Sequence, residues 1–541
     1  MSIPSVSTTN PDREGAVSSR GELAVRQRMR IALELALCGA AAVGVGLRWV
    51  GINAQSMWAD EGFTTWLTQY PPSTILKLLP TDNHPPLYYF LIHFWRLLFG
   101  NSVFALRSFS ALCSTLCIPL MYLLARKIFE SRLCGLIAAA FSSLSYVLLW
   151  YANEVRDYAL LELLSCVCVY CMLLALERAT AGRLFATGVA VAAILYTHNM
   201  GWFYAPGLLA FWFCYPSEMK FRERMKRGAS VAAVVFVLFA AWLRPMWVQV
   251  RWVHENFWPT KPGVTDLLRT ICIYSGIDPD GLQHALRAQI PGMKLLGFRT
   301  WAGVVLLCLG TGFIFGMRST DSAVRRKVLA ITSIALLPIL LVFVDSRILT
   351  PIYINRVFIG AGVFLPLLLL APVAFASYGN RLLELSPALG LLIAACVSVA
   401  VHREQRDDWR GVTRYTLGLP ESQRVVFAFQ PFCQILMNYY ADQLAGPDSP
   451  VHITGLMSKA ELEDATNPNP GIPPLAKADP IGMLNEAISS GRYKEIDVAL
   501  QMFRLPPSLL AMPEFLSSHC VSVTTTDFNQ IRVTRCMLSP K

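Results

Sequence analysis

The sequence of 541 residues is 54% hydrophobic and only 15% charged, against roughly 25% charged residues in an ordinary soluble domain. This balance excludes a soluble globular protein and predicts that lipid is the main solvent of the chain. The formal net charge of +11 comes largely from Lys and Arg in short loops beside apolar blocks, where such residues set membrane orientation. The sequence shows no separate basic face interleaved with aromatic residues, so we expect no nucleic-acid partner.

The N-terminal segment, residues 1–30, is rich in Ser and Arg and lacks apolar periodicity. We predict that it is a disordered cytoplasmic tail. The apolar block that follows, residues 31–50, is longer than the roughly 7 to 15 residues of a signal-peptide core and lacks a clear small-x-small cleavage site. This block therefore predicts a retained membrane anchor.

Apolar blocks continue along the chain as far as about residue 401, and a helix that crosses a bilayer takes roughly 20 such residues. With the first block they predict about eleven membrane-spanning helices in a domain of residues 31–402. The others are expected over residues 103–125, 133–150, 158–177, 184–197, 201–215, 229–247, 301–317, 328–344, 357–375 and 387–401.

The number of spans within 184–215 depends on the charge of the loops. Two short helices broken near His198 and Gly201 place the basic loops around residues 126–132, 178–183, 220–227 and 318–327 on the inner face. One long helix would move the last two of these loops outside, against the positive-inside bias. Two helices are therefore predicted, and residues 51–102, residues 248–300 and the C-terminal segment fall on the outer face.

The C-terminal segment, residues 403–541, changes in composition and predicts a small extracytoplasmic α/β domain. Residues 424–430 are typical of a strand, 431–441 of a helix and 519–537 of two alternating strands, with a Pro-rich linker over 466–480. Cys520 and Cys536 flank the two last strands. A disulfide between them is expected if the domain faces an oxidising compartment.

The first outer loop carries an acidic pair, Asp60 and Glu61, followed by a His-Pro-Pro segment that begins at His84. Two acids beside a membrane surface are costly unless they are hydrated, paired or used. A solvated loop or a helix cap would explain a lone acidic pair. Here that explanation must also account for the neighbouring His-Pro-Pro and its aromatic residues.

Several basic residues are predicted at the same outer face. Each alone could be a snorkelling interfacial residue, but together they could hold a phosphate group. An acid opposite such cations suits inverting glycosyl transfer from a lipid-linked sugar, because the carboxylate accepts the proton of an acceptor hydroxyl while the cations stabilise the departing phosphate. The cations are Arg107, Arg156, His198, Arg347 and Arg356.

The motifs resemble those of the GT-C glycosyltransferases, over residues 50–440. The nearest groups are the protein O-mannosyltransferases, the lipid A aminoarabinose transferases and bacterial galacturonosyltransferase-like proteins. The motifs are Asp60-Glu61 after the first span, D-N-H-P-P-L-Y-Y at 82–89, F-G-N-S-V-F-A-L-R at 99–107, Y-A-N-E-V-R-D-Y-A-L-L at 151–161, T-H-N at 197–199, P-I-Y-I-N-R-V-F at 351–358 and D-D-W-R-G-V-T-R-Y at 407–415.

The resemblance implies a polytopic helical GT-C fold in a bacterial cell membrane and a polyprenyl-phosphate sugar donor. It implies an acceptor at the outer face, which could be a glycolipid, a polysaccharide or a protein. Asp60 matches the position of the catalytic base, with Glu61 beside it. The positions linked to the donor phosphate and lipid are matched by His84, Arg156 and Arg356. Arg107, Tyr158 and His198 are further candidates for binding the donor.

Two other functions are compatible with the sequence. A polytopic transporter would have a similar composition, although the charges here collect at the outer ends of the predicted spans rather than at mid-depth. Transfer from a pyrophosphate-linked oligosaccharide would favour a divalent cation held by several acids. Asp60, Glu61, Asp82, Glu154 and Asp157 could supply such ligands, so a divalent cation remains possible and no metal ligand is assigned.

Overall fold

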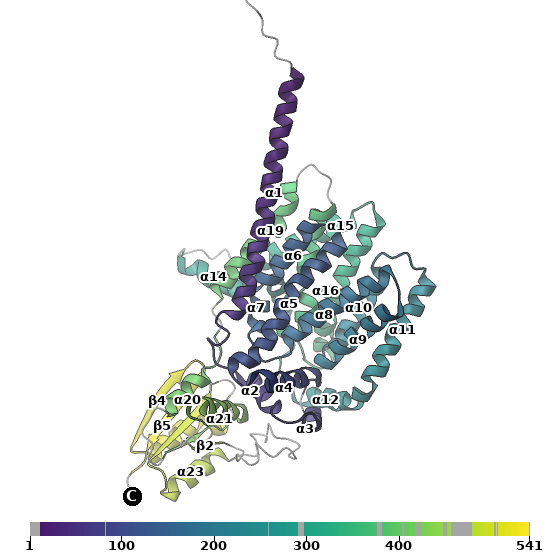
Figure 1. The fold of residues 1–541 in the computed structure, drawn as a ribbon. Coiled ribbons are helices and arrows are strands. Elements are labelled where there is room, and N and C mark those ends of the chain that lie inside the picture. The colour runs from purple at the N-terminus through teal and green to yellow at the C-terminus, as the bar shows by residue number, and fades with distance from the viewer. Residues whose placement is uncertain are drawn as a thin grey trace, which may run out of the picture.

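The structure is a computed structural model of the chain. It describes residues 11–539, except positions 82, 258 and 506 and the segments 290–296, 376–380, 403–404, 418–423, 447–451, 456–478 and 503–504. The described part is a bundle of helices with a five-stranded sheet near its C-terminal end (Figure 1). This agrees with the predicted fold class, an all-α membrane domain followed by a small α/β domain.

Within the described residues, seven helices are long and apolar enough to cross a membrane, or up to nine if each of two bent pairs is one span. One bent pair is α6 with α7, and the other is the segment Asn355–Gly362 with Leu365–Phe375. The helices of this domain are α1 (Pro11–Trp49), α5 (Val103–Phe129), α6 (Arg132–Leu144), α7 (Tyr146–Ala152), α8 (Tyr158–Glu177), α9 (Ala181–Thr197), α10 (Gly201–Cys214), α11 (Phe221–Phe239), α15 (Phe298–Met317), α16 (Ser322–Ile348), η3 (Asn355–Phe358), α17 (Ile359–Gly362), η4 (Leu365–Leu369), α18 (Leu370–Phe375) and α19 (Arg381–Val401).

Every predicted span coincides with helical structure, but the count of eleven is not confirmed. The difference lies in α9 and α10, which have 17 and 14 residues and are shorter than the 18 residues of a full candidate span. The predicted break between them is present, because α9 ends at Thr197 and α10 begins at Gly201. His198 therefore lies at a junction between two helices rather than within one.

The helix α1 begins earlier than expected. The segment 1–30 was predicted to be disordered, whereas the structure continues α1 back to Pro11, and this helix projects beyond the others (Figure 1). Strong helix formers explain the difference, since residues 22–30 consist mainly of Glu, Leu, Ala, Gln, Met and Arg. An ion pair between Arg30 and Glu34 one turn later adds to this. Residues 1–10 lie outside the described part.

The bend between α6 and α7 measures 58° and is held by Arg48, a fully buried residue of α1. Its guanidinium donates hydrogen bonds to the carbonyls of Ser142 and Ser143, which lie in the last turn of α6, and to that of Gly44. A helix end leaves such carbonyls without partners inside the helix, so a cation suits this place. After the bend, α7 leads into the loop 153–157, which contacts Glu61 of α2 through the backbone N–H of Val155.

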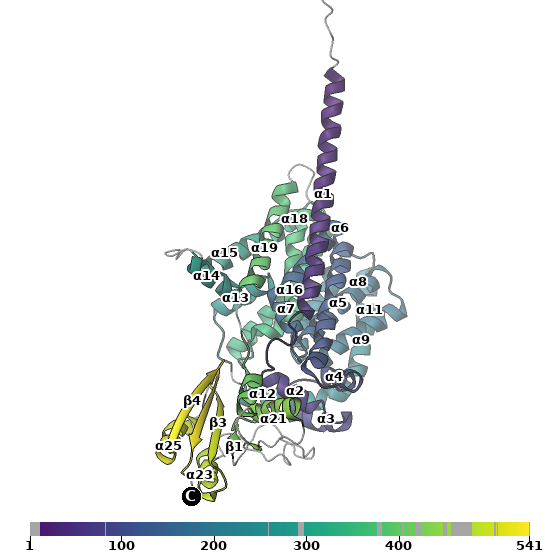
Figure 2. The same cartoon turned by 60° about the vertical axis from the view of Figure 1, so that its left-hand side comes forward.

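The first outer loop and the C-terminal domain lie at the same end of the bundle, as Figures 1 and 2 show. The loop forms α2 (Ala59–Leu67), α3 (Pro72–Leu78), η1 (Leu79–Thr81) and α4 (Leu87–Phe99), and α12 (Leu243–Asn256) lies beside them. Helix α21 (Pro431–Ala445) packs on α2, and the hydroxyl of Tyr440 accepts from the backbone N–H of Met57 at 2.7 Å. A side chain at Gly62 would collide with Leu436, because its Cβ would lie 2.7 Å from Cγ.

The C-terminal sheet has the strand order β2-β1-β3-β5-β4. Strand β1 is parallel to both its neighbours, and the pairs β3–β5 and β5–β4 are antiparallel. The bounds are β1 (Arg424–Phe427), β2 (His452–Thr454), β3 (Glu495–Gln501), β4 (Ser522–Phe528) and β5 (Ile531–Met537), with helices α20 (Trp409–Leu417), α23 (Pro480–Ser490), α24 (Pro507–Leu510) and α25 (Met512–His519).

The sequence predicted the first strand, the helix after it and the final strand pair, but not β2 and β3. The Pro-rich linker lies almost entirely outside the described residues. Cys520 and Cys536 are joined by a disulfide with a Cα–Cα distance of 5.5 Å, so the bond links the end of α25, just before β4, to β5. Two further helices, α13 (Val264–Tyr274) and α14 (Pro279–Gln289), lie between α12 and α15.

Candidate active site

Asp60 lies in the first turn of α2, just after the chain leaves α1, and its side chain is 30% exposed. Nη2 of Arg356 lies 3.4 Å from Oδ2 of Asp60. The guanidinium carbon of Arg356 also lies 5.2 Å from the ring centre of Trp58 and 5.9 Å from that of Tyr158. The two rings and the ion pair hold Arg356 in place, while Asp60 keeps a surface that solvent or a substrate can reach.

Glu61, the next residue, is fully buried. Arg107 donates from Nε and Nη2 to its two carboxylate oxygens, each at 2.8 Å, and the backbone N–H of Val155 donates to Oε1 at 2.9 Å. Burial alone raises the pKa of Glu61, but the charges of Arg107 and Arg406 and these hydrogen bonds outweigh it, so the pKa lies below its ordinary value. Glu61 is an ionised anchor that ties α2 to the loop 153–157.

Arg107 uses all five of its N–H donors inside the protein. Besides the pair with Glu61, Nη1 donates to the carbonyls of Ile52 and Gln55, and Nη2 donates to that of Ser56. A guanidinium paired in this way has no donor left for a phosphate group. The predicted donor-phosphate role of Arg107 therefore does not fit this geometry. The predicted place of Glu61 beside Asp60 in the catalytic pair does not fit it either, because the carboxylate of Glu61 is buried and paired with Arg107.

Arg156 follows Val155, whose backbone N–H binds Glu61, and its side chain reaches α2 at Thr64. Its Nη1 lies 3.3 Å from the hydroxyl of Thr64, and its Nη2 lies 3.0 Å from Nε2 and 3.3 Å from Nδ1 of His84. Burial alone lowers the pKa of Arg156, but neighbouring acidic groups that include Asp60 raise it well above its ordinary value. Arg156 is therefore a permanent positive charge beside Asp60.

His84, Asp157 and His198 form a buried group whose ligand-type atoms lie within 4.8 Å of one another. Among the described residues, both carboxylate oxygens of Asp157 lack a hydrogen-bond partner. The spacing alone would suit a metal ion. However, Arg156 already lies against both ring nitrogens of His84, and the backbone N–H of Met200 donates to Nδ1 of His198 at 3.1 Å. We therefore assign no metal to this group.

The charge state of His198 follows from its surroundings. Burial lowers its pKa to about 3, and the charges of Arg156 and Arg356 act in the same direction, although Asp157 opposes them. Its ring is neutral at physiological pH. Because Nδ1 accepts a hydrogen bond, the proton of the neutral ring is on Nε2. His198 can thus donate one hydrogen bond to a ligand.

Arg406 belongs to the site although the sequence did not assign it, and Glu154, which was named from the sequence only as a possible ligand of a divalent cation, is its partner. Nη2 of Arg406 donates to Oε1 of Glu154 at 3.1 Å, and Arg406 also lies 3.9 Å from Glu61. Burial raises the pKa of Glu154 to about 7, and the charges of Glu61 and Asp60 add to the rise. Glu154 lies within the segment 151–161 that carried the resemblance, and Arg406 directly precedes 407–415. Those motifs were the signal available in the sequence.

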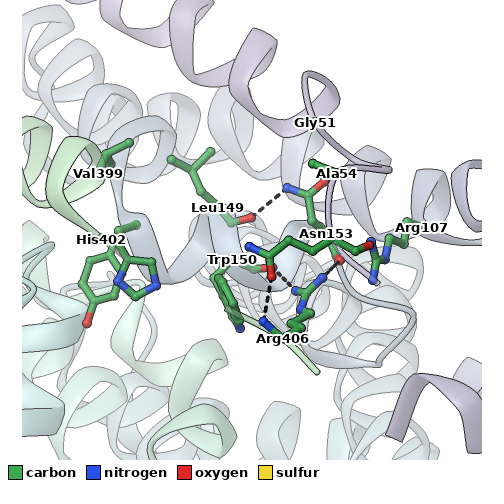
Figure 3. Close-up of a pocket in the computed structure, with 11 residues that line it drawn as sticks. Gly51, Ala54, Arg107, Leu149, Trp150, Asn153, Val399, His402 and Arg406 are labelled. Atoms are coloured by element: carbon green, nitrogen blue, oxygen red, sulfur yellow. Dashed lines mark hydrogen bonds between the residues drawn. The ribbon is translucent and has the colours of Figure 1, made fainter. Parts of the chain in front are cut away.

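A cavity of about 220 Å³ lies next to this group of paired charges and is lined in part by Arg107 and Arg406 (Figure 3). The figure shows His402 and Val399 on one side and Arg406 and Arg107 on the other, with Leu149 and Trp150 between them. The full lining is Gly51, Ala54, Gln55, Arg107, Tyr146, Leu149, Trp150, Asn153, Val399, His402 and Arg406. Neither Asp60 nor any of the cations beside it lines this cavity.

The structure thus divides the eight predicted residues into two sets. One set converges around the N-terminal end of α8, where the rings of His84 and His198 lie 5.0 Å apart and those of Tyr158 and His198 lie 6.2 Å apart. The other set is the buried pair of Glu61 and Arg107. The first set consists of Asp60, His84, Arg156, Tyr158, His198 and Arg356.

The fold and the site together define a polytopic membrane protein with a small C-terminal α/β domain, in which the acids and cations of the candidate site lie close together. Residues 83–244, just under a third of the chain, match the family model described as dolichyl-phosphate-mannose-protein mannosyltransferase. This match confirms the resemblance predicted from the motifs. No curated protein sequence matches the chain significantly.

Several solved structures are similar to this chain. The oligosaccharyltransferase of Archaeoglobus fulgidus, in complex with zinc and sulfate, has a TM-score of 0.48 and 12% identity, covering 86% of this chain and 68% of its own. ArnT from Cupriavidus metallidurans bound to undecaprenyl phosphate has a TM-score of 0.46 and 15% identity, covering 93% and 98%. The S. cerevisiae protein O-mannosyltransferase complex bound to its sugar donor has a TM-score of 0.32 and 19% identity, covering 49% and 37%. We transfer no residue role from these likenesses.

Proposed function

We propose that the protein transfers a sugar from a polyprenyl-phosphate donor to an acceptor at the outer face of a bacterial cell membrane, with inversion at the anomeric carbon. The observation that carries the proposal is the partly exposed carboxylate of Asp60, which lies beside Arg356 and near Arg156. An acid and fixed cations at one site can accept a proton and stabilise a departing phosphate in the same step.

In this mechanism Asp60 is the general base. It accepts the proton of the acceptor hydroxyl while that oxygen attacks the anomeric carbon, and the bond from this carbon to the phosphate oxygen breaks. Arg356 and Arg156 bind the phosphate, and His84 lies against Arg156 and holds its side chain. Tyr158 supports Arg356 from one face, and the Nε2–H of His198 donates to a donor oxygen.

Glu61 and Arg107 have a positioning role in this proposal. Their buried pair joins the start of α2 to the loop 51–56 and to Val155, so it fixes the direction in which Asp60 points. A base must lie within hydrogen-bond reach of the proton that it accepts, so a small displacement of α2 reduces the rate.

The proposed topology places the N-terminus in the cytoplasm and the C-terminal domain outside. The basic loops predicted on the inner face support this orientation. The disulfide between Cys520 and Cys536 supports an oxidising location for the C-terminal domain. The first outer loop packs on this domain, so Asp60 shares its side of the membrane.

The test compares the purified wild type with Asp60→Asn in a transfer assay from radiolabelled undecaprenyl-phosphate sugars. Loss of a general base is expected to lower the rate by about 10² to 10⁴-fold. Asp527→Asn is the matched control, because Asp527 is an exposed acid of β4 paired with Arg532. Wild-type activity in Asp60→Asn would contradict the base assignment. If no lipid-linked sugar stabilises the wild type against heat, the transporter alternative gains support.

A further inference from the structure

Gln249 lies on α12, a helix to which the sequence assigned no part of the candidate site. Its side chain is fully buried. Nε2 donates to the carbonyls of Leu79 and His84, each at 2.9 Å, so both N–H groups of the amide are used on a single loop. Helix α12 lies beside η1, where this loop begins (Figure 1). A residue from a separate part of the chain therefore holds the segment 79–84.

Asn199 joins this contact from the junction between α9 and α10. Its Nδ2 donates to the carbonyl of Asn83 at 2.9 Å and to Oε1 of Gln249 at 3.1 Å. The two amides thus bind each other and also bind three carbonyls of the loop. The same junction carries His198, whose ring lies 5.0 Å from that of His84. The amide pair therefore links the two segments that supply the histidines of the site.

The composition of the loop explains why it needs donors from outside. Pro80, Pro85 and Pro86 have no backbone N–H, so they cannot donate to its carbonyls. A buried carbonyl without a hydrogen bond costs free energy, and an amide side chain supplies two N–H donors from one planar group. An apolar side chain in place of either amide would remove these donors from the loop.

The contact extends from the loop to the positive charge of Arg156. The carbonyl that Gln249 holds belongs to His84, and the next residue is Pro85, whose ring fixes φ at about −65°. The backbone of His84 is thus fixed, and its ring lies against Arg156 with 3.0 Å between Nε2 and Nη2. Nη1 of Arg156 reaches Thr64 of α2 at 3.3 Å. Gln249 is therefore connected to Arg156 through one residue.

We propose that Gln249 and Asn199 are positioning residues, which fix His84 and thereby hold the guanidinium of Arg156 where it binds the donor phosphate. The identity of the ligand rests on the proposed function, whereas the amide contacts do not depend on it. Gln249 has no exposed surface, so it acts through the loop and not by contact with the donor.

The first experiment follows the position of His84 without any substrate. Diethyl pyrocarbonate modifies accessible imidazole rings, and mass spectrometry of the full-length protein in detergent gives the rate at each histidine. His84 is 7% exposed and should react slowly in the wild type. In Gln249→Met it should react about 5- to 30-fold faster, the effect of one or two lost hydrogen bonds on the opening of the loop. The exposed His519 is the internal reference.

Gln430→Met is the matched control. Gln430 also binds the backbone with both ends of its amide, since Nε2 donates to the carbonyl of Gln501 at 3.1 Å and Oε1 accepts from its N–H at 2.8 Å, but it lies in the C-terminal domain. This variant should leave the rate at His84 unchanged. Melting temperatures show which variants fold, and Asn199→Leu, which should also expose His84, supplies the test if Gln249→Met does not fold. Wild-type rates at His84 in the folded variants, or equal exposure in Gln430→Met, would overturn the inference.

The second experiment determines whether the effect passes through His84. Gln249→Met should weaken the binding of undecaprenyl phosphate about fivefold, the effect of one lost hydrogen bond. In a His84→Ala background the same substitution should weaken binding by less than about twofold, because the ring that transmits the effect is gone. An amide with a purely structural role would lower the affinity equally in both backgrounds, and that result would overturn the inference.

The two experiments separate this inference from the proposed function. If Gln249→Met exposes His84 but the wild type binds no undecaprenyl phosphate and transfers no sugar, the proposed function fails while the positioning of His84 stands. If transfer depends on Asp60 but Gln249→Met leaves the rate at His84 unchanged, the positioning role fails while the proposed function stands.

Discussion

Arg406 and Glu154 lie 3.1 Å apart although 252 residues separate them in the chain. Arg406 follows the last membrane helix, and Glu154 lies in the loop between α7 and α8. Their contact joins the C-terminal segment to the loop that also supplies Val155 and Arg156. The candidate site is therefore assembled from segments far apart in the chain, and its stability depends on buried charges being paired.

The buried pair of Glu61 and Arg107 gives the first prediction. Glu61→Ala should destabilise the protein by about 3 to 5 kcal/mol, because it leaves the guanidinium of Arg107 buried without its counter-charge. The measurement is the melting temperature in detergent. Glu177→Ala removes a half-exposed partner of Lys127 and should cost about 0 to 1 kcal/mol. Similar losses of stability in both variants would show that the buried ion pair contributes no more to stability than the exposed one.

Arg356 gives the second prediction. Arg356→Ala should weaken the binding of undecaprenyl phosphate about 10- to 150-fold, which corresponds to the loss of one charged hydrogen bond of about 1.5 to 3 kcal/mol. Arg347→Ala is the control, because Arg347 lies at the end of α16 and donates to the carbonyl of Pro262. Ligand-induced shifts of the melting temperature would measure both. Equal weakening would mean that general surface charge, not Arg356, attracts the lipid.

Glu154 gives a pH-dependent prediction. Burial raises its pKa to about 7, above the value of about 4.3 expected in the unfolded chain. The native state therefore binds this proton more tightly, so the stability that Glu154 contributes is present at low pH and falls as the pH rises from about 4 to 7. Glu154→Gln stays neutral, so it should become more stable relative to the wild type between pH 5 and pH 8.

The comparison of Glu154→Gln with the wild type separates this residue from other groups. Asp407, whose pKa burial raises to about 6, titrates in the same range but is present in both proteins. Parallel profiles for the wild type and Glu154→Gln would contradict the prediction.

The disulfide gives the fourth prediction. Replacing Cys520 and Cys536 by Ser should destabilise the C-terminal sheet by about 3 kcal/mol, the chain-entropy effect of opening a loop of this length. Limited proteolysis with and without reductant measures it. In cells, Cys520 and Cys536 should resist alkylation until a reductant is added. If both react beforehand, the domain lies in a reducing compartment and the proposed topology is wrong.

Much of the fold could be predicted because a membrane span is a local property of the sequence. A run of about 20 apolar residues identifies a helix wherever it occurs, which is why α5 and α8 begin at the predicted residues. Strands β2 and β3 were missed for the opposite reason. They are short or buried segments whose pairing with β1 and β5 is decided by distant parts of the chain.

The sequence by itself determined that the chain is a polytopic membrane protein and that a small sheet follows the helical bundle, and it singled out the segments that form the candidate site. It could not separate Asp60 from Glu61, because adjacent acids look alike until their surroundings are known. Only the tertiary structure decided that Glu61 and Arg107 neutralise each other in the interior, whereas Asp60 remains accessible beside Arg356. The physical reason is that burial and charge pairing depend on residues brought together from helices far apart in the chain.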